Sequence, residues 1–298
     1  QMTAVSRINQ LYRGEELDRV QRLESRFINT TMKVTLLPFV SLLLALVSGS
    51  TASAQLLAAK DGPIVYGHHH VNVTSIDAAK KFWVDALGGT AIKVGSAEII
   101  KFPNVLVFLR QRAPTGGTKG TTVNHIGFQV PNLREALTRV RAAGYPIITR
   151  AELPPEMVVK DDMVHIADQN TYAAFTMGPD EIKVELFENK ALEMPIALHH
   201  IHFASQQVDE MKAWYVKTLN ARPGKRGSFE AADLPGVNLT WSPSPDPVGG
   251  TAGRALDHIG FEVRDLENYC KKLEAMGVTF SRPYTKVASL NIAIAFFT

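Results

Sequence analysis

The stretch Asn124-His125-Ile126-Gly127-Phe128-Gln129-Val130 has three relatives elsewhere in the 298-residue chain, so an internal repeat is the strongest signal in the sequence. The related stretches are 67–73 (GHHHVNV), 199–205 (HHIHFAS) and 257–263 (DHIGFEV). The interval from His68 to His125 nearly equals that from His200 to His258, and the two pairs are offset by a nearly constant distance. Such regular spacing predicts four copies of one structural module.

Each stretch alternates between apolar residues and histidine or other polar residues, which is typical of a β-strand with two different faces. One face would pack in a core. The other face would carry the histidines, and in the first and third copies it carries two of them, two positions apart: His68 and His70, then His200 and His202. The intervening His69 and His199 are expected to point away from that face.

A helical pattern follows each of these strands, and short β-type runs follow each helix. The helices are predicted at 76–87, 133–143, 208–219 and 266–276. Gly88, Gly144 and Gly277 suit the C-terminal ends of three helices, and Asn132 and Asp265 suit N-caps. The further strands are predicted at 99–109, 163–166, 172–177, 182–187, 237–241 and 291–297.

The predicted fold is therefore α+β, built from four tandem βαβββ modules, the last of them cut short at Thr298. A module of this size cannot bury both faces of its sheet, so modules should pair. We expect two domains, 62–190 and 195–298, each with a curved mixed sheet around a trough lined by histidines. The segments 116–120 and 243–250 are predicted as linkers between modules, and the first of these lacks the spacing and helix of a phosphate-binding loop.

Composition excludes several classes of protein. The formal net charge is +3, from 32 basic and 29 acidic side chains, without a basic cluster, which does not favour nucleic-acid binding. A single cysteine, Cys270, excludes an intrachain disulfide and a cysteine-based zinc site. Any metal must therefore be bound by histidine and carboxylate side chains.

The segment 32–54 has the features of a secretory signal peptide: Met32-Lys33, an apolar stretch at 36–47 and small residues at 52–54. We expect a mature start at Gln55, export to a periplasmic or extracellular compartment, and no stable membrane insertion after cleavage. A retained signal anchor is the alternative. Residues 1–31 are polar and charged, and they are either an amphipathic helix or the product of a start assigned too far upstream.

These residues resemble the vicinal oxygen chelate superfamily, which includes glyoxalase I, bleomycin-resistance proteins and extradiol ring-cleavage dioxygenases. The resemblance covers residue 64 to the end of the chain. It depends on the four histidine-bearing strand starts, the helix ending from Phe82-Trp83 to Gly89, and the final strand of a module pair at 182–187.

The resemblance implies a divalent metal held by histidines from two first strands and a glutamate from a last strand, which match His68, His125 and Glu185. In the second half, His200 and His258 match the ligand positions. Fe(II) is favoured for two imidazoles and one carboxylate, while Mn, Ni, Co and Zn remain open. Glyoxalase I resemblance implies a second glutamate in the first module, where Phe108 stands instead.

His70 and His202 are the candidate catalytic residues, as acid/base groups or hydrogen-bonding partners near bound substrate, with simple solvent exposure as the alternative. His165 and Tyr172 lie on predicted strands but receive no role. The leading function is an exported enzyme that chelates vicinal oxygens of a small organic substrate, as an extradiol-type dioxygenase. A glyoxalase-like isomerase or lyase, and a bleomycin-resistance-like binding protein without catalysis, remain alternatives. The expected partner is a small molecule, and a homodimer is left open.

Overall fold

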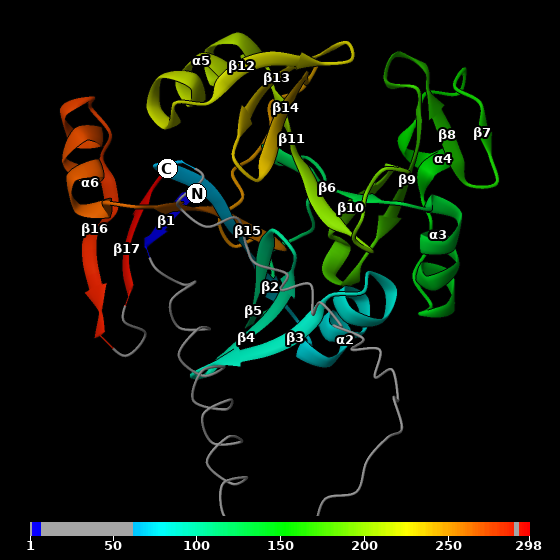
Figure 1. Ribbon diagram of the computed structural model, residues 1–298, viewed down its shortest axis with the longest axis horizontal. Coiled ribbons are helices and arrows are strands. Elements are labelled where there is room, and N and C mark those ends of the chain that lie inside the picture. The colour runs from blue at the N-terminus through cyan, green and yellow to red at the C-terminus, as the bar shows by residue number, and fades with distance from the viewer. Residues whose placement is uncertain (1, 7–61, 289–291) are drawn as a thin grey trace, which may run out of the picture.

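The computed structural model describes residues 2–6, 62–288 and 292–298 (Figure 1). The predicted signal peptide at 32–54 and the helix considered within 1–31 lie outside the described residues. Among the described residues, no helix has the length and apolar character needed to span a membrane.

All four predicted modules are present, each beginning with a long strand followed by a helix. The elements of the first module are β2 (Ile64–Val73), α2 (Ile76–Lys80) continued by the π-helical η2 (Lys81–Ala86), β3 (Thr90–Val94), β4 (Ala97–Phe102) and β5 (Val105–Gln111). Those of the second are β6 (Val123–Val130), α3 (Leu133–Ala142), α4 (Thr149–Glu152), β7 (Val159–Lys160), β8 (Met163–Ile166), β9 (Thr171–Met177) and β10 (Lys183–Glu188), with short 3-10 turns η3 (Ala167–Gln169) and η4 (Pro179–Glu181).

The second half repeats this order. The third module contains β11 (Ala197–Ser205), α5 (Val208–Leu219), β12 (Arg222–Arg226), β13 (Phe229–Leu234) and β14 (Val237–Pro243). The fourth contains β15 (Leu256–Val263), α6 (Leu266–Ala275), β16 (Phe280–Val287) and β17 (Ile292–Phe297). The predicted α+β class and the repeat are thus confirmed.

The helix ends follow the sequence signals. The side chains of Asn132 and Asp265 accept hydrogen bonds from the first turns of α3 and α6. Gly88, Gly144 and Gly277 have φ values of +81°, +85° and +90°, a conformation in which a side chain is strained. These positions end the helices and turn the chain back toward the sheet.

The modules pair in a crossed way, the first with the fourth and the second with the third. The eight-stranded sheet has the order β16-β17-β1-β15-β2-β5-β4-β3, so it joins the first and fourth modules. The nine-stranded sheet has the order β12-β13-β14-β11-β6-β10-β9-β8-β7, so it joins the second and third. We expected the first module to share a sheet with the second, within 62–190, and the third with the fourth, within 195–298. The observed sheets pair the modules differently.

The connections between modules explain the crossed pairing. The segment between β10 and β11 is short, and β11 lies antiparallel beside β6 in the same sheet. The two predicted linkers, by contrast, pass from one sheet to the other and bind each other, with Gly249 donating to the Gly120 carbonyl. Ala255, just after the second linker, donates to the carbonyl of Gly116. Arg254 reinforces this crossing by donating to the carbonyls of Gly117 and Lys119.

The strand β1 (Met2–Ser6) was not predicted. It lies between β15 and β17, parallel to the former and antiparallel to the latter. Its register pairs Thr3 with Gly260, as β10 pairs Glu185 with Gly127 on β6. The strand β1 therefore occupies, beside β15, the place that β10 occupies beside β6.

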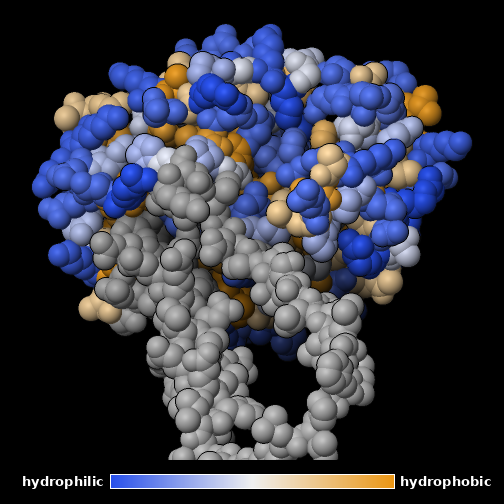
Figure 2. Space-filling model, viewed as in Figure 1, coloured by the Kyte–Doolittle hydropathy of each residue, from blue (hydrophilic) through white to orange (hydrophobic). Residues whose placement is uncertain are grey.

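One large apolar core contains residues from all four modules, including the aromatic side chains of Phe82, Trp83, Phe128, Tyr215 and Trp241. The helices pack in two pairs. Tyr145, just after α3, donates to the Ala78 carbonyl on α2, and Tyr269 on α6 donates to the Thr218 carbonyl on α5. Hydrophilic residues cover most of the face in Figure 2 that grey atoms do not hide. The core thus lies on the helix side of each sheet, and the opposite sheet faces remain for the histidines.

Candidate metal centre

Three histidines and one glutamate meet at the centre of the nine-stranded sheet. His125 is on β6, His200 and His202 are on the adjacent β11, and Glu185 is on β10 at the other side of β6. All four side chains are buried. The ligand atoms of His125, His200 and His202 all lie within 4.8 Å of one another.

The ligand atoms of His125, His200 and Glu185 form a small triangle. Glu185 Oε2 lies 3.0 Å from His125 Nε2 and 2.9 Å from His200 Nε2, and the two nitrogens are 3.4 Å apart. Two atoms bound to one transition-metal ion at about 2.1 Å are separated by about 3.0 Å in octahedral and about 3.4 Å in tetrahedral geometry. The triangle therefore matches one face of the coordination polyhedron of such an ion.

Space for His200 comes from a glycine on the neighbouring strand. Gly127 lies opposite His200 in the antiparallel pairing of β6 and β11, and a Cβ atom at Gly127 would collide with the imidazole ring. A register shift between Leu198 and His200 also interrupts the ladder here. The glycine and the irregularity together allow the ring to lie over the strand.

The residue that precedes each central histidine orients its ring. Asn124 Oδ1 lies 2.9 Å from His125 Nδ1, and His199 Nδ1 lies 2.9 Å from His200 Nδ1. Asn124 Oδ1 accepts from Nδ1–H, the tautomer that leaves Nε2 able to bind a metal ion. His199, expected to point away, is instead stacked on Phe187 beside the site.

His202 lies beside this triangle, with its ring centroid 4.6 Å from that of His125. Its Nε2 is 3.0 Å from the hydroxyl of Ser242 on β14. His202 on β11 is equivalent in the repeat to Gly127 on β6. Glu185 pairs with Gly127, and Thr240 on β14 pairs with His202. The position symmetric to Glu185 thus carries a hydroxyl and not a second carboxylate.

Burial and mutual interactions set the charges of these groups. Burial lowers the pKa of His200 and His202 well below the usual value, and it also lowers the pKa of His125 against the opposing effect of Glu185. Burial would raise the pKa of Glu185, but the imidazoles of His200 and His125 outweigh it and hold this pKa well below the usual value. Neutral imidazoles beside an ionised carboxylate are the states in which these side chains bind metal.

Aromatic side chains and one arginine surround the centre. Phe175 contacts His125 edge to face at 5.3 Å, and Phe229 contacts His202 in the same way at 5.1 Å. Arg226, the last residue of β12, extends over Phe187 and brings one terminal nitrogen within 3.3 Å of His200 Nε2. The centre is thus enclosed by apolar rings on two sides and has a cation at its edge.

The eight-stranded sheet holds a second group of histidines. His68 lies over Gly260 as His200 lies over Gly127, and His70 is paired with His258 as His202 is paired with His125. The His258 ring is oriented by Asp257, whose Oδ1 lies 2.7 Å from His258 Nδ1. The surroundings are more apolar, because Ile99, Leu106, Phe108, Ile292 and Ile294 form a separate hydrophobic cluster here.

The predicted ligands are therefore distributed differently from the expectation. The structure does not bring His68 together with His125 and Glu185, because β2 and β6 belong to different sheets. It places Glu185 between His125 and His200, and it places His68 near His258, at 5.8 Å between ring centroids. The two candidate catalytic histidines are separated in the same way, His202 beside His125 and His70 beside His258.

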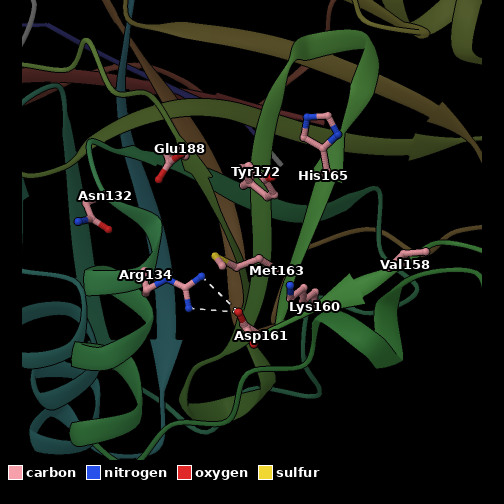
Figure 3. A pocket seen from close by; sticks show the side chains of 9 residues that line it. All are labelled: Asn132, Arg134, Val158, Lys160, Asp161, Met163, His165, Tyr172 and Glu188. Atoms are coloured by element: carbon pink, nitrogen blue, oxygen red, sulfur yellow. Dashed lines mark hydrogen bonds and ion pairs between the residues drawn. The ribbon is translucent and has the colours of Figure 1, made fainter.

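An open cavity of about 580 Å³ lies elsewhere, between the start of α3 and the edge strands β7, β8 and β9 (Figure 3). Its lining includes His165 and Tyr172, which pair across β8 and β9. Tyr172 shares a strand face with Ala174, a residue of the main core, whereas Phe175 on the other face contacts His125. This cavity is thus on the side of the sheet opposite the histidine centre.

Sequence reasoning missed four residues of the centre and its counterpart: Asn124, Asp257, Ser242 and Arg226. Two of them had a signal, because a polar residue precedes the histidine in Asn124-His125 and Asp257-His258 at equivalent points of the repeat. Ser242 and Arg226 had none, since their places depend on how β12 and β14 pack around the trough.

Comparison with known proteins agrees with this architecture. The model of the Glyoxalase/Bleomycin resistance protein/Dioxygenase superfamily matches residues 65–168 and 197–298. No curated protein sequence matches the chain. Glyoxalase I from Zea mays is similar in structure, with 15% identity, a TM-score of 0.60, and coverage of 78% of this chain and 87% of that one.

A putative dioxygenase from Bacillus subtilis is similar as well, with 14% identity, a TM-score of 0.51, and coverage of 78% and 85% of the two chains. At these identities the likeness shows the fold alone, whereas the family match extends over both halves of the chain. The chain therefore belongs to the Glyoxalase/Bleomycin resistance protein/Dioxygenase superfamily.

Proposed function

We propose that this chain is a metal-dependent enzyme in which His125, His200 and Glu185 bind one divalent transition-metal ion. The observation that carries the proposal is the triangle of ligand atoms, with edges of 2.9, 3.0 and 3.4 Å. Two imidazoles and one carboxylate on one side of an ion leave positions open for substrate oxygens, the arrangement used by non-haem Fe(II) oxygenases. Fe(II) is the favoured metal, with Mn, Ni, Co and Zn as alternatives.

The proposed reaction is extradiol-type dioxygenation of a small organic molecule with two neighbouring oxygens. The bound ion would supply Lewis acidity and activation of O₂. The residues around it would do the rest: Phe175 and Phe229 exclude water and favour an aromatic substrate, while His202, neutral and held by Ser242, accepts a proton from a substrate hydroxyl.

An isomerase or lyase acting through an enediolate is the second candidate, because the same neutral His202 could remove a proton from carbon. The presence of Thr240 where a second carboxylate would complete a four-ligand site argues for the dioxygenase. The two reactions are separated by oxygen consumption with a catechol probe after reconstitution under Fe(II). Turnover without O₂ uptake would favour the isomerase.

Metal stoichiometry tests the proposal directly. After anaerobic reconstitution with Fe(II), elemental analysis should find about one ion per chain in the unmodified protein and in His68→Ala, whose ring lies in the other sheet. Glu185→Gln and His200→Ala should lower metal affinity at least about 100-fold, since both are direct ligands. Glu193→Gln, an exposed glutamate in the segment before β11, is the matched control.

Unchanged metal content in Glu185→Gln and His200→Ala would overturn the proposal, and so would a complete absence of bound metal in the unmodified protein. In the latter case, a trough that still binds ligand would support a bleomycin-resistance-like binding protein.

We further propose that the enzyme is exported, on the basis of the sequence at 32–54 alone. Mass spectrometry of the mature protein should find Gln55 at its N-terminus. Recovery of peptides from 32–54 in the mature protein would argue for a retained segment instead.

A further inference from the structure

Arg226 is the one residue of β12 whose side chain turns into the trough. The other residues of this strand are exposed, whereas the Arg226 guanidinium lies over Phe187, with Cζ 5.9 Å from the ring centroid. The turn after Arg226 is fixed from the second module, because the carboxylate of Asp168 accepts a hydrogen bond from the backbone of Ser228. The arginine is therefore held at the metal centre by contacts from two modules.

The half-buried guanidinium forms no ion pair with a carboxylate within the described part of the chain, although Glu185 and Asp168 act on it from farther away. Its Nε is buried and makes no hydrogen bond within the described part of the chain. Its one hydrogen-bond neighbour there is His200 Nε2, at 3.3 Å, and the nearby carboxylate of Glu185 is already engaged by His125 and His200. A buried Nε–H without an acceptor, on a partly buried cation without a paired anion, is costly, so a group that the protein itself does not supply should satisfy it.

Metal binding would make this imbalance larger. An ion bound to His200 Nε2 takes the lone pair that Arg226 now faces, so the arginine loses this contact. The divalent ion and the guanidinium would together carry three positive charges, against one negative charge on Glu185 and one on the more distant Asp168. An anion between the ion and Arg226 would restore the balance, and the Nε edge of a guanidinium can bind two oxygens of such a group at once.

We propose that Arg226 determines substrate specificity by binding an oxyanion, a carboxylate or a phosphonate, carried by the substrate next to its metal-chelating oxygens. This inference rests on the proposed function, since it names the substrate class of that same centre. The enzyme would act on anionic diols or hydroxy acids in preference to their neutral analogues.

The test compares probes that differ only in the anion. The full chain, loaded with Co(II) in place of a redox-active ion, is titrated calorimetrically with catechol, 3,4-dihydroxybenzoate and 3,4-dihydroxyphenylphosphonate. The unmodified protein should bind one or both anionic probes about 10- to 100-fold more tightly than catechol, as expected for a buried charge-assisted pair. The stronger of the two identifies the oxyanion. Equal affinity for all three would overturn the inference.

Variants assign the preference to Arg226. Arg226→Gln should abolish it while leaving Co(II) binding intact, and Arg226→Lys should retain part of it. Arg222→Gln, on the same strand but exposed and paired with Asp233, is the matched control and should behave like the unmodified protein. If Arg226→Gln still prefers the anionic probes over catechol, Arg226 is not the group that binds the oxyanion.

Failure of the metal proposal would be visible separately. If the protein binds no Co(II), the apo chain is tested by thermal shift with inorganic phosphate and with benzoate. Stabilisation that is lost in Arg226→Gln but kept in Arg222→Gln would support the oxyanion site without the metal. If neither phosphate nor benzoate stabilises the apo chain, the oxyanion site is ruled out together with the metal site.

Discussion

At the scale of single residues, the centre depends on which ring nitrogen of each histidine faces the trough. In three of the four modules the residue before the first-strand histidine contacts Nδ1: Asn124, His199 and Asp257. The fourth has Gly67 at this point, and His68 Nδ1 is buried without a hydrogen-bond partner among the described residues. In β6 and β11 this local contact orients the ring of a proposed metal ligand.

Removal of that contact should weaken metal binding without removing a ligand. In Asn124→Ala the His125 ring loses its orientation, and metal affinity should fall about 10- to 100-fold, the usual effect of such outer partners. Asn124→Asp keeps an acceptor at the same place and should restore most of the affinity. Competition titration with a chelating dye measures both. An Asn124→Ala protein with unchanged affinity would contradict the role of this residue.

Glu262 predicts a pH dependence of stability. Burial on β15 raises its pKa to about 7 from a usual value of 4.5. Because the folded state binds the proton more strongly, this residue contributes stability below about pH 4.5, and that contribution is lost as pH rises through 7. The loss should amount to about 3 kcal/mol at most.

Glu262→Gln removes the titration while keeping the shape of the side chain. The difference in unfolding free energy between the variant and the unmodified protein, measured in urea, should therefore shift in favour of the variant between pH 5 and pH 8. Glu193→Gln, exposed in a loop, should show no such shift. Parallel pH profiles for the Glu262→Gln variant and the unmodified protein would rule the explanation out.

At the scale of elements, the sequence predicted well whatever is local. The helix boundaries at 208–219, the N-caps Asn132 and Asp265 and the glycines after three helices agree with the structure, because each depends on residues close in sequence. Besides β1, the strands β3, β7, β12, β13 and β16 were missed. The last three contain Gly224, charged residues and Pro283, and their strand structure comes from pairing with neighbours rather than from a two-residue alternation.

The glycine on β6 gives an element-scale prediction with an internal control. In Gly127→Ala the new methyl group collides with the His200 ring and should displace it, so that metal affinity falls by at least about 10-fold. Gly260→Ala produces the same collision with His68 in the other sheet. The two variants should lose comparable stability, but only Gly127→Ala should lose metal, as measured by thermal unfolding and elemental analysis. Equal metal loss in both would contradict a single centre in the nine-stranded sheet.

At the scale of the whole molecule, the sequence predicted the modules but not their partners. The first strands are so alike that β6 could lie beside β2 or beside β11 with the same alternation of apolar and histidine residues. The linkers cross between the sheets and stabilise the observed pairing, because Gly249 donates to the Gly120 carbonyl and Ala255, just after the second linker, donates to that of Gly116. Those contacts join residues far apart in the chain, and a single sequence carries no pattern for them. The expected triad of His68, His125 and Glu185 changed for this reason alone, because His200 stands where His68 was placed.

The crossed pairing can be tested by an engineered disulfide. Gln129 on β6 and Ala197 on β11 are directly paired, and the Cα separation of such a pair, about 4.5–5.5 Å, falls within the range that a disulfide spans. The double variant Gln129→Cys with Ala197→Cys should form this bond under mild oxidation, since the native Cys270 is buried on α6. Peptide mapping by mass spectrometry identifies the linked segments, and Gln129→Cys alone is the control. If β6 instead lay beside β2, the two cysteines would remain reduced and residue 197 would be free to react with a maleimide. Formation of the bond, with metal content preserved, would show that the second and third modules build the centre together.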